Sequence, residues 1–293
     1  MRRALGLLIL CGSASAVAHD SPEHTAERLD ELLLAAPAAS VLIERAEVHR
    51  ELGEFQGAHR LLQQAAVLEP RNPSVWLAHA ENYAQFDQHD ATILAATEYL
   101  QLAGPSLRGL WLRADARAET GQLDPAHRDC LALSDLNANV EVALLCAHVA
   151  SLCGDGAGAF ETLERGYAET GAAVLLLAAF EQSLAVGEFQ RAAELAAQGA
   201  SLGSVNTLWV LRRAEAVELT GDEGLAAALR AEAFDSATAS VARRDSCLNR
   251  VNWLEALAAF DQERAGLEIE AVRGRCSDEQ TLRQRLLNLE ELL

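Results

Sequence analysis

A glycine recurs along this chain at a nearly constant interval, and that interval restricts the fold more than any other feature of the sequence. The glycines concerned are Gly53, Gly121, Gly154, Gly187 and Gly221. Their separations are 68, 33, 33 and 34 residues, so one period of about 34 fits all five if a further unit lies between the first two. A fixed period of roughly 20–50 residues is typical of repeat arrays. We therefore expect a stack of similar units.

A small residue follows each of these points by five positions. The further unit is placed at Phe86-Asp87, with its glycine lost, and the count there starts from Phe86. The residues found are Ala58, Ala91, Ala126, Ala159, Ala192 and Ala226. Glycine adopts the left-handed backbone that ends many helices, and apolar residues recur at helical spacing on both sides of it. Each unit is therefore predicted to be two antiparallel helices that approach closely at the alanine.

This arrangement resembles the tetratricopeptide repeat family over about residues 39 to 235. The family pattern has an aromatic or apolar residue early in the first helix and a small residue one turn later. A turn glycine, an alanine five residues further on and a closing proline follow. The matching residues are Trp76, Ala80 and Tyr83, and Gly53, Ala58, Ala65 and Pro70. Two departures are that the second unit fits only if its turn is one residue short, and that Phe180 stands where a small residue is usual.

The resemblance implies an all-α fold, a right-handed α-solenoid of about six helix-turn-helix repeats with helical caps. We divide the chain into a signal peptide (1–18), an N-terminal capping helix (19–38), the repeat solenoid (39–235) and a C-terminal helical cap (236–293). Ser21-Pro22-Glu23 is expected to begin a helix that runs to about Ala36. Ala242 to Arg264 is expected to form one longer helix, and Ser277-Asp278-Glu279-Gln280 has the pattern of a capping box that opens the last helix.

The first eighteen residues have the features of a secretory signal. Arg2-Arg3 precedes a short apolar run from Ala4 to Cys11, and small residues then provide cleavage sites after Ala16 or Ala18. The apolar run is too short to span a bilayer. The sequence therefore predicts an exported protein, periplasmic or secreted, without a membrane-spanning segment.

Charge and composition argue against several functions. The formal net charge is −19, which would repel nucleic acid and anionic membrane surfaces. The chain has no lysine, which removes Schiff-base catalysis and the lysine of a phosphate-binding loop. The glycines of residues 154–158 fit a turn between paired helices better than a phosphate site. We expect no enzymatic activity and no cofactor.

The resemblance also implies where a partner would bind, because first helices of such repeats line a concave groove. The position six residues before each turn glycine should face that groove. These positions are Glu47, Glu81, Asp115, His148, Glu181 and Glu215, with Glu81 replaced by Ala80 if the second unit is counted from Ala91. Most are carboxylates, which would favour a cationic peptide or protein surface. The alternative is that an acidic protein carries carboxylates on any solvated helix face.

Trp111 lies one helical turn before Asp115 and is a candidate aromatic anchor for the partner, or else a half-buried packing residue. Family members that clamp a terminal carboxylate use lysine and asparagine. This chain has Glu44, Ala78 and Leu112 at the asparagine position, so that activity is not implied.

Five cysteines remain after the expected cleavage, so they cannot all pair with one another. The turns expected between helices would allow Cys130 to pair with Cys146 and Cys247 with Cys276. Buried cysteines acting as small apolar residues are the alternative.

The expected mature N-terminus suggests a second function. Cleavage after Ala18 would leave His19 as the first residue, whose α-amine and imidazole could bind copper or nickel. A solvated, frayed terminus is the alternative.

Overall fold

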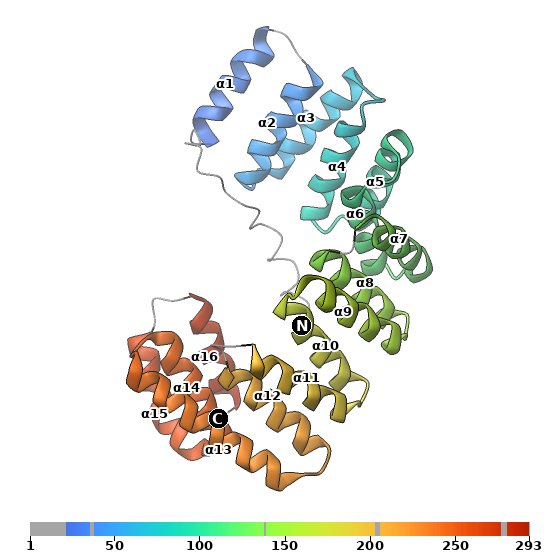
Figure 1. The fold of residues 1–293 in the computed structure, drawn as a ribbon. Coiled ribbons are helices and arrows are strands. Elements are labelled where there is room, and N and C mark those ends of the chain that lie inside the picture. The colour runs from blue at the N-terminus through green and yellow to red at the C-terminus, as the bar shows by residue number, and fades with distance from the viewer. Residues whose placement is uncertain (1–21, 36–37, 138, 203–205, 277–279, 293) are drawn as a thin grey trace. The chain divides into compact units, whose positions relative to one another are not determined.

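The chain is helical throughout the part that the computed structural model describes, residues 22–35, 38–137, 139–202, 206–276 and 280–292 (Figure 1). These residues form sixteen α-helices and no strand. The helices are α1 (Pro22–Ala35), α2 (Ala39–Glu51), α3 (Phe55–Leu68), α4 (Pro73–Gln85), α5 (His89–Ala103), α6 (Leu107–Glu119), α7 (Leu123–Leu136), α8 (Val140–Leu152), α9 (Gly156–Thr170), α10 (Ala173–Ala185), α11 (Phe189–Ser201), α12 (Asn206–Leu219), α13 (Glu223–Arg243), α14 (Cys247–Phe260), α15 (Gln262–Arg275) and α16 (Gln280–Leu292). The predicted all-α fold is confirmed.

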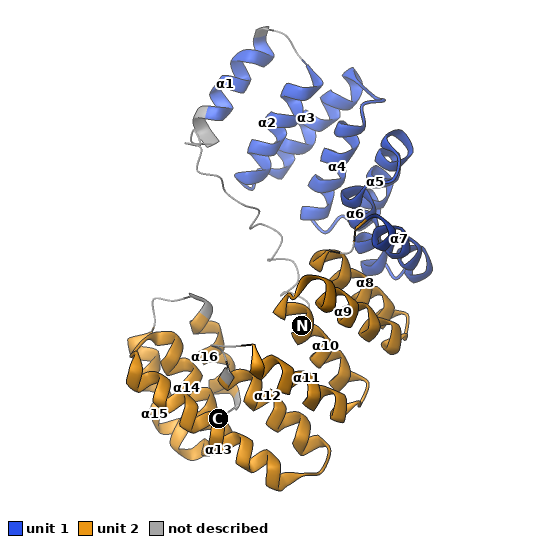
Figure 2. Cartoon of the chain, in the orientation of Figure 1, with its two compact units in different colours: residues 1–136 blue, residues 137–293 orange. Residues whose placement is uncertain are grey.

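The helices belong to two compact units, residues 1–136 and 137–293 (Figure 2). In unit 1, helix α1 is followed by the pairs α2–α3, α4–α5 and α6–α7. In unit 2, the pairs α8–α9, α10–α11, α12–α13 and α14–α15 precede α16. First helices of successive pairs pack on one another, as α2 does on α4 and α4 on α6. This repeated stacking of helix pairs confirms the predicted repeat architecture.

The six turns inside the first six pairs share one backbone conformation. Each has a residue with a φ between 55° and 91° in the left-handed region: Gly53, Asp87, Gly121, Gly154, Gly187 and Gly221. Asp87 therefore occupies the missing glycine position, and aspartate is one of the few other residues that tolerate this conformation. The expectation that the second turn is one residue short is wrong.

With Asp87 at the turn position, Thr92 and not Ala91 is the equivalent of Ala58 in the second pair. Counting five from Asp87 gives Thr92, which is completely buried, whereas Ala91 is only half-buried. The other members of the set, Ala58, Ala126, Ala159, Ala192 and Ala226, are at most 1% exposed. The Thr92 hydroxyl donates to the carbonyl of Gln88 at 3.0 Å, so burial leaves no polar atom unsatisfied there. This register also makes Glu81, and not Ala80, the equivalent of Glu47.

The C-terminal segment contains a seventh helix pair where one long helix was expected. The expected helix from Ala242 to Arg264 is interrupted twice, because Ser246 and Asp261 act as N-terminal caps of α14 and α15. The Ser246 hydroxyl accepts from the amide of Asn249 at 3.3 Å, and the Asp261 carboxylate accepts from that of Arg264 at 3.1 Å. Helices α14, α15 and α16 share a buried core that includes Val251, Leu254, Leu257, Ile269, Leu282 and Leu286. Residues 277–279 of the expected capping box lie outside the described residues.

A disulfide joins Cys247 to Cys276, with 5.5 Å between their Cα atoms. Cys247 is the first residue of α14 and Cys276 follows the last residue of α15, so the bond ties the open end of this hairpin. The Cys130–Cys146 disulfide is not formed. Both are buried thiols, Cys130 in unit 1 and Cys146 in unit 2.

Candidate functional site

The face of α2, α4 and α6 in unit 1 carries the residues that the sequence singled out for binding. Glu47 lies on α2, Glu81 on α4, and Trp111 and Asp115 on α6. These helices stack in order, so their side chains form a continuous stripe across three repeats. We call this stripe, together with Arg50 and Arg108, the first-helix face.

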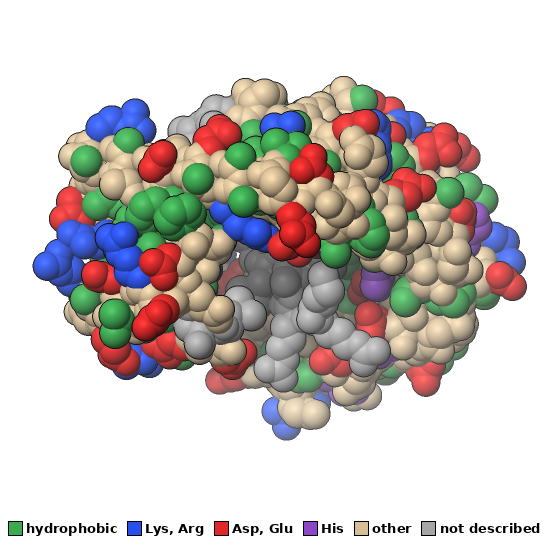
Figure 3. Space-filling model, turned by 90° about the horizontal axis from the view of Figure 1, so that it is seen from below, with side chains coloured by type: hydrophobic (Ala, Val, Ile, Leu, Met, Phe, Trp, Pro, Cys, Tyr) green, Lys and Arg blue, Asp and Glu red, His purple; other side chains and the backbone are tan. Residues whose placement is uncertain are grey.

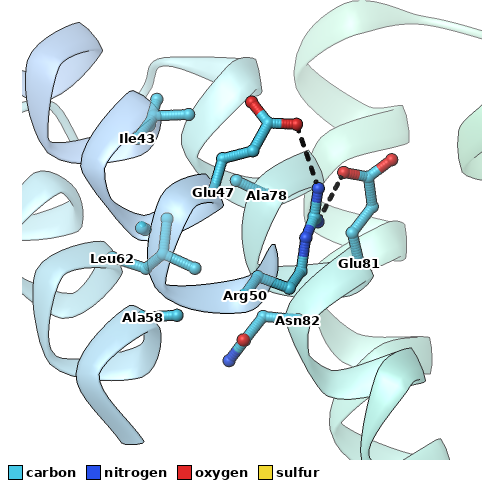
Figure 4. Close-up of a pocket in the computed structure, with 9 residues that line it drawn as sticks. Ile43, Glu47, Arg50, Ala58, Leu62, Ala78, Glu81 and Asn82 are labelled. Carbon is cyan, nitrogen blue, oxygen red and sulfur yellow. Dashed lines mark hydrogen bonds and ion pairs between the residues drawn. The ribbon is translucent and has the colours of Figure 1, made fainter. Parts of the chain in front are cut away.

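Two arginines hold the central carboxylate of the first-helix face. Arg50 donates from Nη1 to Glu81 at 2.9 Å, and Arg108 donates from Nε to the other oxygen of Glu81 at 2.7 Å. Arg50 also donates to Glu47 at 3.2 Å. In Figure 4 the Arg50 side chain lies between the carboxylates of Glu47 and Glu81. The three helices are thus linked by a ladder of alternating charge.

The ladder also sets the protonation of Glu81. Burial alone would raise the pKa of this carboxyl, but the hydrogen bonds and charges of Arg108 and Arg50 outweigh burial and hold the pKa below its usual value. Glu81 is therefore an anion committed to two arginines inside the protein. Glu47, with 57% of its side chain exposed, is the more accessible carboxylate.

A small pit opens beside this ladder, between α2, α3 and α4, with about 40 Å³ of free space (Figure 4). Its apolar walls come from Ile43, Ala46, Ala58, Leu62 and Ala78. Glu47, Arg50, Glu81 and Asn82 supply its polar groups. The alanines that let the helices approach also leave this space, which is large enough for a short side chain of a bound partner.

Trp111 is half-buried at the α6 end of the same face. The guanidinium carbon of Arg108 lies 5.8 Å from the centre of the Trp111 ring, a cation–π contact. The indole nitrogen is buried and has no hydrogen-bond partner among the described residues. The ring therefore packs within the protein and also supports Arg108 at the end of the ladder.

Unit 2 presents the remaining predicted positions on its own first helices. His148 on α8, Glu181 on α10 and Glu215 on α12 are all exposed. Arg212 on α12 lies near both carboxylates: burial lowers its pKa, and the charges of Glu181 and Glu215 oppose that effect. As on α2 and α4, the acidic positions occur beside arginine.

Helix α14, the next first helix of unit 2, also carries a glutamate bound by arginine, and neither residue was predicted from the sequence. Arg285 on α16 binds both oxygens of Glu255 on α14, at 2.8 and 2.6 Å. In the view of Figure 3, acidic, basic and apolar side chains are interspersed, without one broad acidic area.

The carboxylates of this face could be predicted from the sequence, but the arginines that bind them were not predicted. Arg50 stands three residues after Glu47, a spacing at which two helical residues face the same side, and this signal could have identified it. Arg108 is separated from Glu81 by 27 residues and by helix α5, so only the stacking of α4 on α6 reveals the contact. Asn82 was also missed, because a buried asparagine has no sequence signature.

A second group of polar and aromatic side chains lies next to the pit, on α3 and α4. The His79 ring is stacked on Tyr83 with 5.6 Å between ring centres, and the rings of His59 and Trp76 each lie 5.9 Å from His79. His79 is 4% exposed. Burial lowers the pKa of His79 to about 4, with a smaller contribution from His59, although a hydrogen bond to the backbone of Leu62 opposes the shift.

This histidine makes the stability of unit 1 sensitive to acid. The unfolded chain takes up a proton on His79 near pH 6.5, whereas the folded protein resists protonation until about pH 4. The contribution of His79 to the free energy of unfolding is therefore fully present above pH 6.5. It is lost as the pH falls towards 4, by about 3 kcal/mol in all. Urea unfolding between pH 7.5 and 4 should show a steeper loss for the wild type than for His79→Phe. Parallel pH profiles for the two proteins would contradict this assignment.

The N-terminal metal candidate has no counterpart among the described residues. His19 lies outside the described residues, and the described residues contain no group of three or more histidine, cysteine or acidic side chains that could hold a metal ion. No helix among the described residues is long and apolar enough to cross a membrane.

Comparison with known proteins agrees with the repeat architecture. Residues 39–82 match the family model described as tetratricopeptide repeat. The C-terminal part of a repeat-containing protein of this kind from Cytophaga hutchinsonii has a similar structure, with a TM-score of 0.59 and 12% identity over 83% of this chain and 99% of that one. A tetratricopeptide repeat protein from Parabacteroides merdae gives a TM-score of 0.53 and 15% identity, over 86% of this chain and 98% of that one.

A further similar structure is that of PilW, a type IV pilus biogenesis factor. Its TM-score is 0.51 at 13% identity, covering 66% of this chain and 91% of that one. No curated protein sequence matches the chain. At these identities the likenesses establish the fold.

Proposed function

We propose that this chain, which has the fold of a tetratricopeptide-repeat solenoid, is a non-catalytic scaffold that binds a peptide or protein partner on its first-helix face. The observation that carries the proposal is the ladder of Glu47, Arg50, Glu81 and Arg108 across α2, α4 and α6. It supplies charged groups in fixed positions beside a pit of side-chain size, without the cost of ordering them when a partner binds.

The partner is proposed to contribute cationic groups to the exposed carboxylates of this face. Glu47 points outward, and Glu181 and Glu215 on unit 2 are exposed as well. Glu81 has a different role, because its two oxygens are already bound by Arg50 and Arg108. A partner of mixed charge, with cationic groups opposite Glu47 and an anionic group opposite Arg108, fits this pattern best.

The proposed setting is outside the cytoplasm, in the periplasm or the medium. The signal-like segment at residues 1–18 supports export. The Cys247–Cys276 disulfide is consistent with it, because such bonds persist in oxidising compartments and are rare in the cytosol. Assembly of an envelope or secreted complex is the corresponding role.

Binding of a labelled, arginine-containing peptide by fluorescence anisotropy tests the proposal. We expect affinity to fall as salt rises, because the contacts are between exposed charges. The double variant Glu47→Gln with Asp115→Asn should bind about five- to thirtyfold more weakly, since each of the two charges contributes on the order of 0.5–1 kcal/mol.

The matched control is Glu98→Gln, which removes an exposed carboxylate from α5, a second helix of the same unit. Its affinity should equal that of the wild type. Binding that responds neither to salt nor to the double variant would exclude the first-helix face as the binding surface. Crosslinking of the mature protein in envelope extracts would then identify the partner and the surface that it uses.

A further inference from the structure

The charge ladder of the first-helix face exposes its charges mainly at its two ends. Arg50 and Glu81 lie in the middle, each with 21% of its side chain exposed, and they bind each other at 2.9 Å. Glu47 at one end is 57% exposed, and Arg108 at the other end is 44% exposed. The ladder therefore has a neutral centre, an accessible carboxylate on α2 and an accessible guanidinium on α6.

The guanidinium of Arg108 is held in position for a further contact. Its Nε donates to Glu81 at 2.7 Å, and its central carbon lies 5.8 Å from the centre of the Trp111 ring. Among the described residues, the two terminal nitrogens of Arg108 have no hydrogen-bond acceptor. An arginine fixed in this way can bind a carboxylate through both terminal nitrogens, with little further loss of side-chain entropy.

Glu47 offers the complementary group at the other end of the ladder. It accepts one hydrogen bond, from Arg50 to Oε1 at 3.2 Å, and a carboxylate can accept several more. Glu47 can therefore bind a guanidinium, and Arg108 can bind a carboxylate. The two residues lie on α2 and α6 with α4 between them, so they do not meet within one chain.

A two-fold axis would bring both pairs of ends together at once. In an assembly with this symmetry, each contact between two different residues occurs twice. Glu47 of one copy meets Arg108 of the other, and Arg108 of the first copy meets Glu47 of the second. A second copy thus supplies a cationic group to Glu47 and an anionic group to Arg108, which is the mixed charge that fits this face best.

The same axis pairs apolar side chains beside these charges. Each helix pair is a hairpin, so successive first helices run in the same direction, and a two-fold axis normal to the face lays α6 of one copy antiparallel to α2 of the other. Trp111, one turn after Arg108, then lies opposite Ile43, one turn before Glu47. Both side chains are half-buried, and Ile43 lines the pit. Their contact removes further apolar surface from water.

We propose that the partner of the first-helix face is a second copy of this chain, in a two-fold dimer in which Glu47 and Arg108 of the two copies bind each other. This dimer rests on the function proposed for the face and names the partner. The formal net charge of −19 on each copy opposes association, although the ladder itself is neutral. Salt at about 0.15 M screens charges more than about 8 Å apart and leaves pairs in contact attractive.

Sedimentation equilibrium of the full chain at this salt concentration tests the dimer. We expect a reversible equilibrium between monomer and dimer for the wild type. Glu47→Arg places two arginines together at each of the two contacts, and Arg108→Glu places two carboxylates together. Each variant alone should therefore associate at least about thirtyfold more weakly than the wild type.

An equimolar mixture of the two variants gives the decisive measurement. In the mixed dimer, the arginine introduced by Glu47→Arg meets the glutamate introduced by Arg108→Glu, and the unchanged Glu47 and Arg108 meet at the other contact. The mixture should associate at least about tenfold more tightly than either variant alone. This recovery cannot come from restored folding, because each chain keeps its own substitution.

The matched control is Glu98→Arg, which reverses an exposed carboxylate on α5 and changes the net charge by the same amount. It should associate as the wild type does. Three results would each overturn the two-fold dimer: a monomeric wild type, a mixture that associates no better than its components, or a mass that grows beyond two chains as concentration rises.

The arginine-containing peptide separates this dimer from the function on which it rests. A chain that stays monomeric but binds the peptide in a salt-dependent manner keeps the proposed function and loses the dimer. A chain that does neither loses both. Dissociation of the dimer by the peptide would support both, because the two ligands would then compete for Glu47.

Discussion

Replacing Asp129 with alanine should lower the free energy of unfolding by about 3–5 kcal/mol, because it leaves two arginines buried without their counter-charge. Asp129 on α7 is 4% exposed. Arg113 on α6 binds it through two hydrogen bonds, at 3.0 and 2.7 Å, and Arg117 adds a third at 2.6 Å. Both arginine side chains are less than 20% exposed, so water cannot replace the carboxylate fully.

Urea unfolding followed by circular dichroism measures the effect. The matched control is Asp30→Ala, which removes the carboxylate that Arg45 binds at 2.8 and 3.2 Å. Arg45 and Arg113 occupy equivalent places in their first helices, but the Asp30 side chain is 55% exposed. We expect this control to cost less than about 1 kcal/mol, as for a surface pair. Equal losses for the two variants would show that burial does not decide the strength of these pairs.

Reducing the Cys247–Cys276 disulfide should destabilise the C-terminal hairpin of unit 2 by roughly 3–4 kcal/mol. The bond joins residues 29 apart in sequence, and a closed loop of that size restricts the unfolded chain by about this amount. Without the bond, the open end of α14 and α15 depends on the core of Leu254, Leu257 and Ile269 alone.

Hydrogen exchange followed by mass spectrometry can localise the loss. Reduced protein, or the Cys247→Ala with Cys276→Ala variant, should exchange faster in α14 and α15 than the oxidised wild type, with α8 to α11 less affected. Cys153→Ser serves as the control, because Cys153 is an exposed thiol outside this hairpin. Unchanged protection of α14 and α15 after reduction would show that the packed core suffices.

Much of the fold could be predicted from the sequence because its information is local. A residue in the left-handed conformation is needed wherever a helix must reverse, and a small residue wherever two helices approach within a hairpin. Both requirements recur with each unit, so Gly121 and Ala126 predict the same structure as Gly187 and Ala192. The prediction was wrong at Asp87, where a residue other than glycine adopts the same left-handed backbone conformation.

The failure at the C-terminus has a related cause. Apolar spacing over residues 242–264 fits one continuous helix, and the break depends on whether Ser246 and Asp261 cap new helices or face solvent within one. Both arrangements, one continuous helix and two capped helices, are compatible with the apolar spacing of this segment. The core shared by α14, α15 and α16 favours two separate helices over one continuous helix, because only a hairpin buries Leu254 and Ile269 together.

The sequence by itself determined the helix pairs, their period and the first-helix positions of Glu47, Glu81 and Asp115, since each follows from neighbours within about one repeat. Only the tertiary structure decided what those positions do. Glu81 became a fixed anion because Arg50 and Arg108 bind it from positions 31 and 27 residues away in the sequence. The physical reason is that electrostatics and burial depend on distance in space, which the stacking of successive repeats sets and the order of residues along the chain does not.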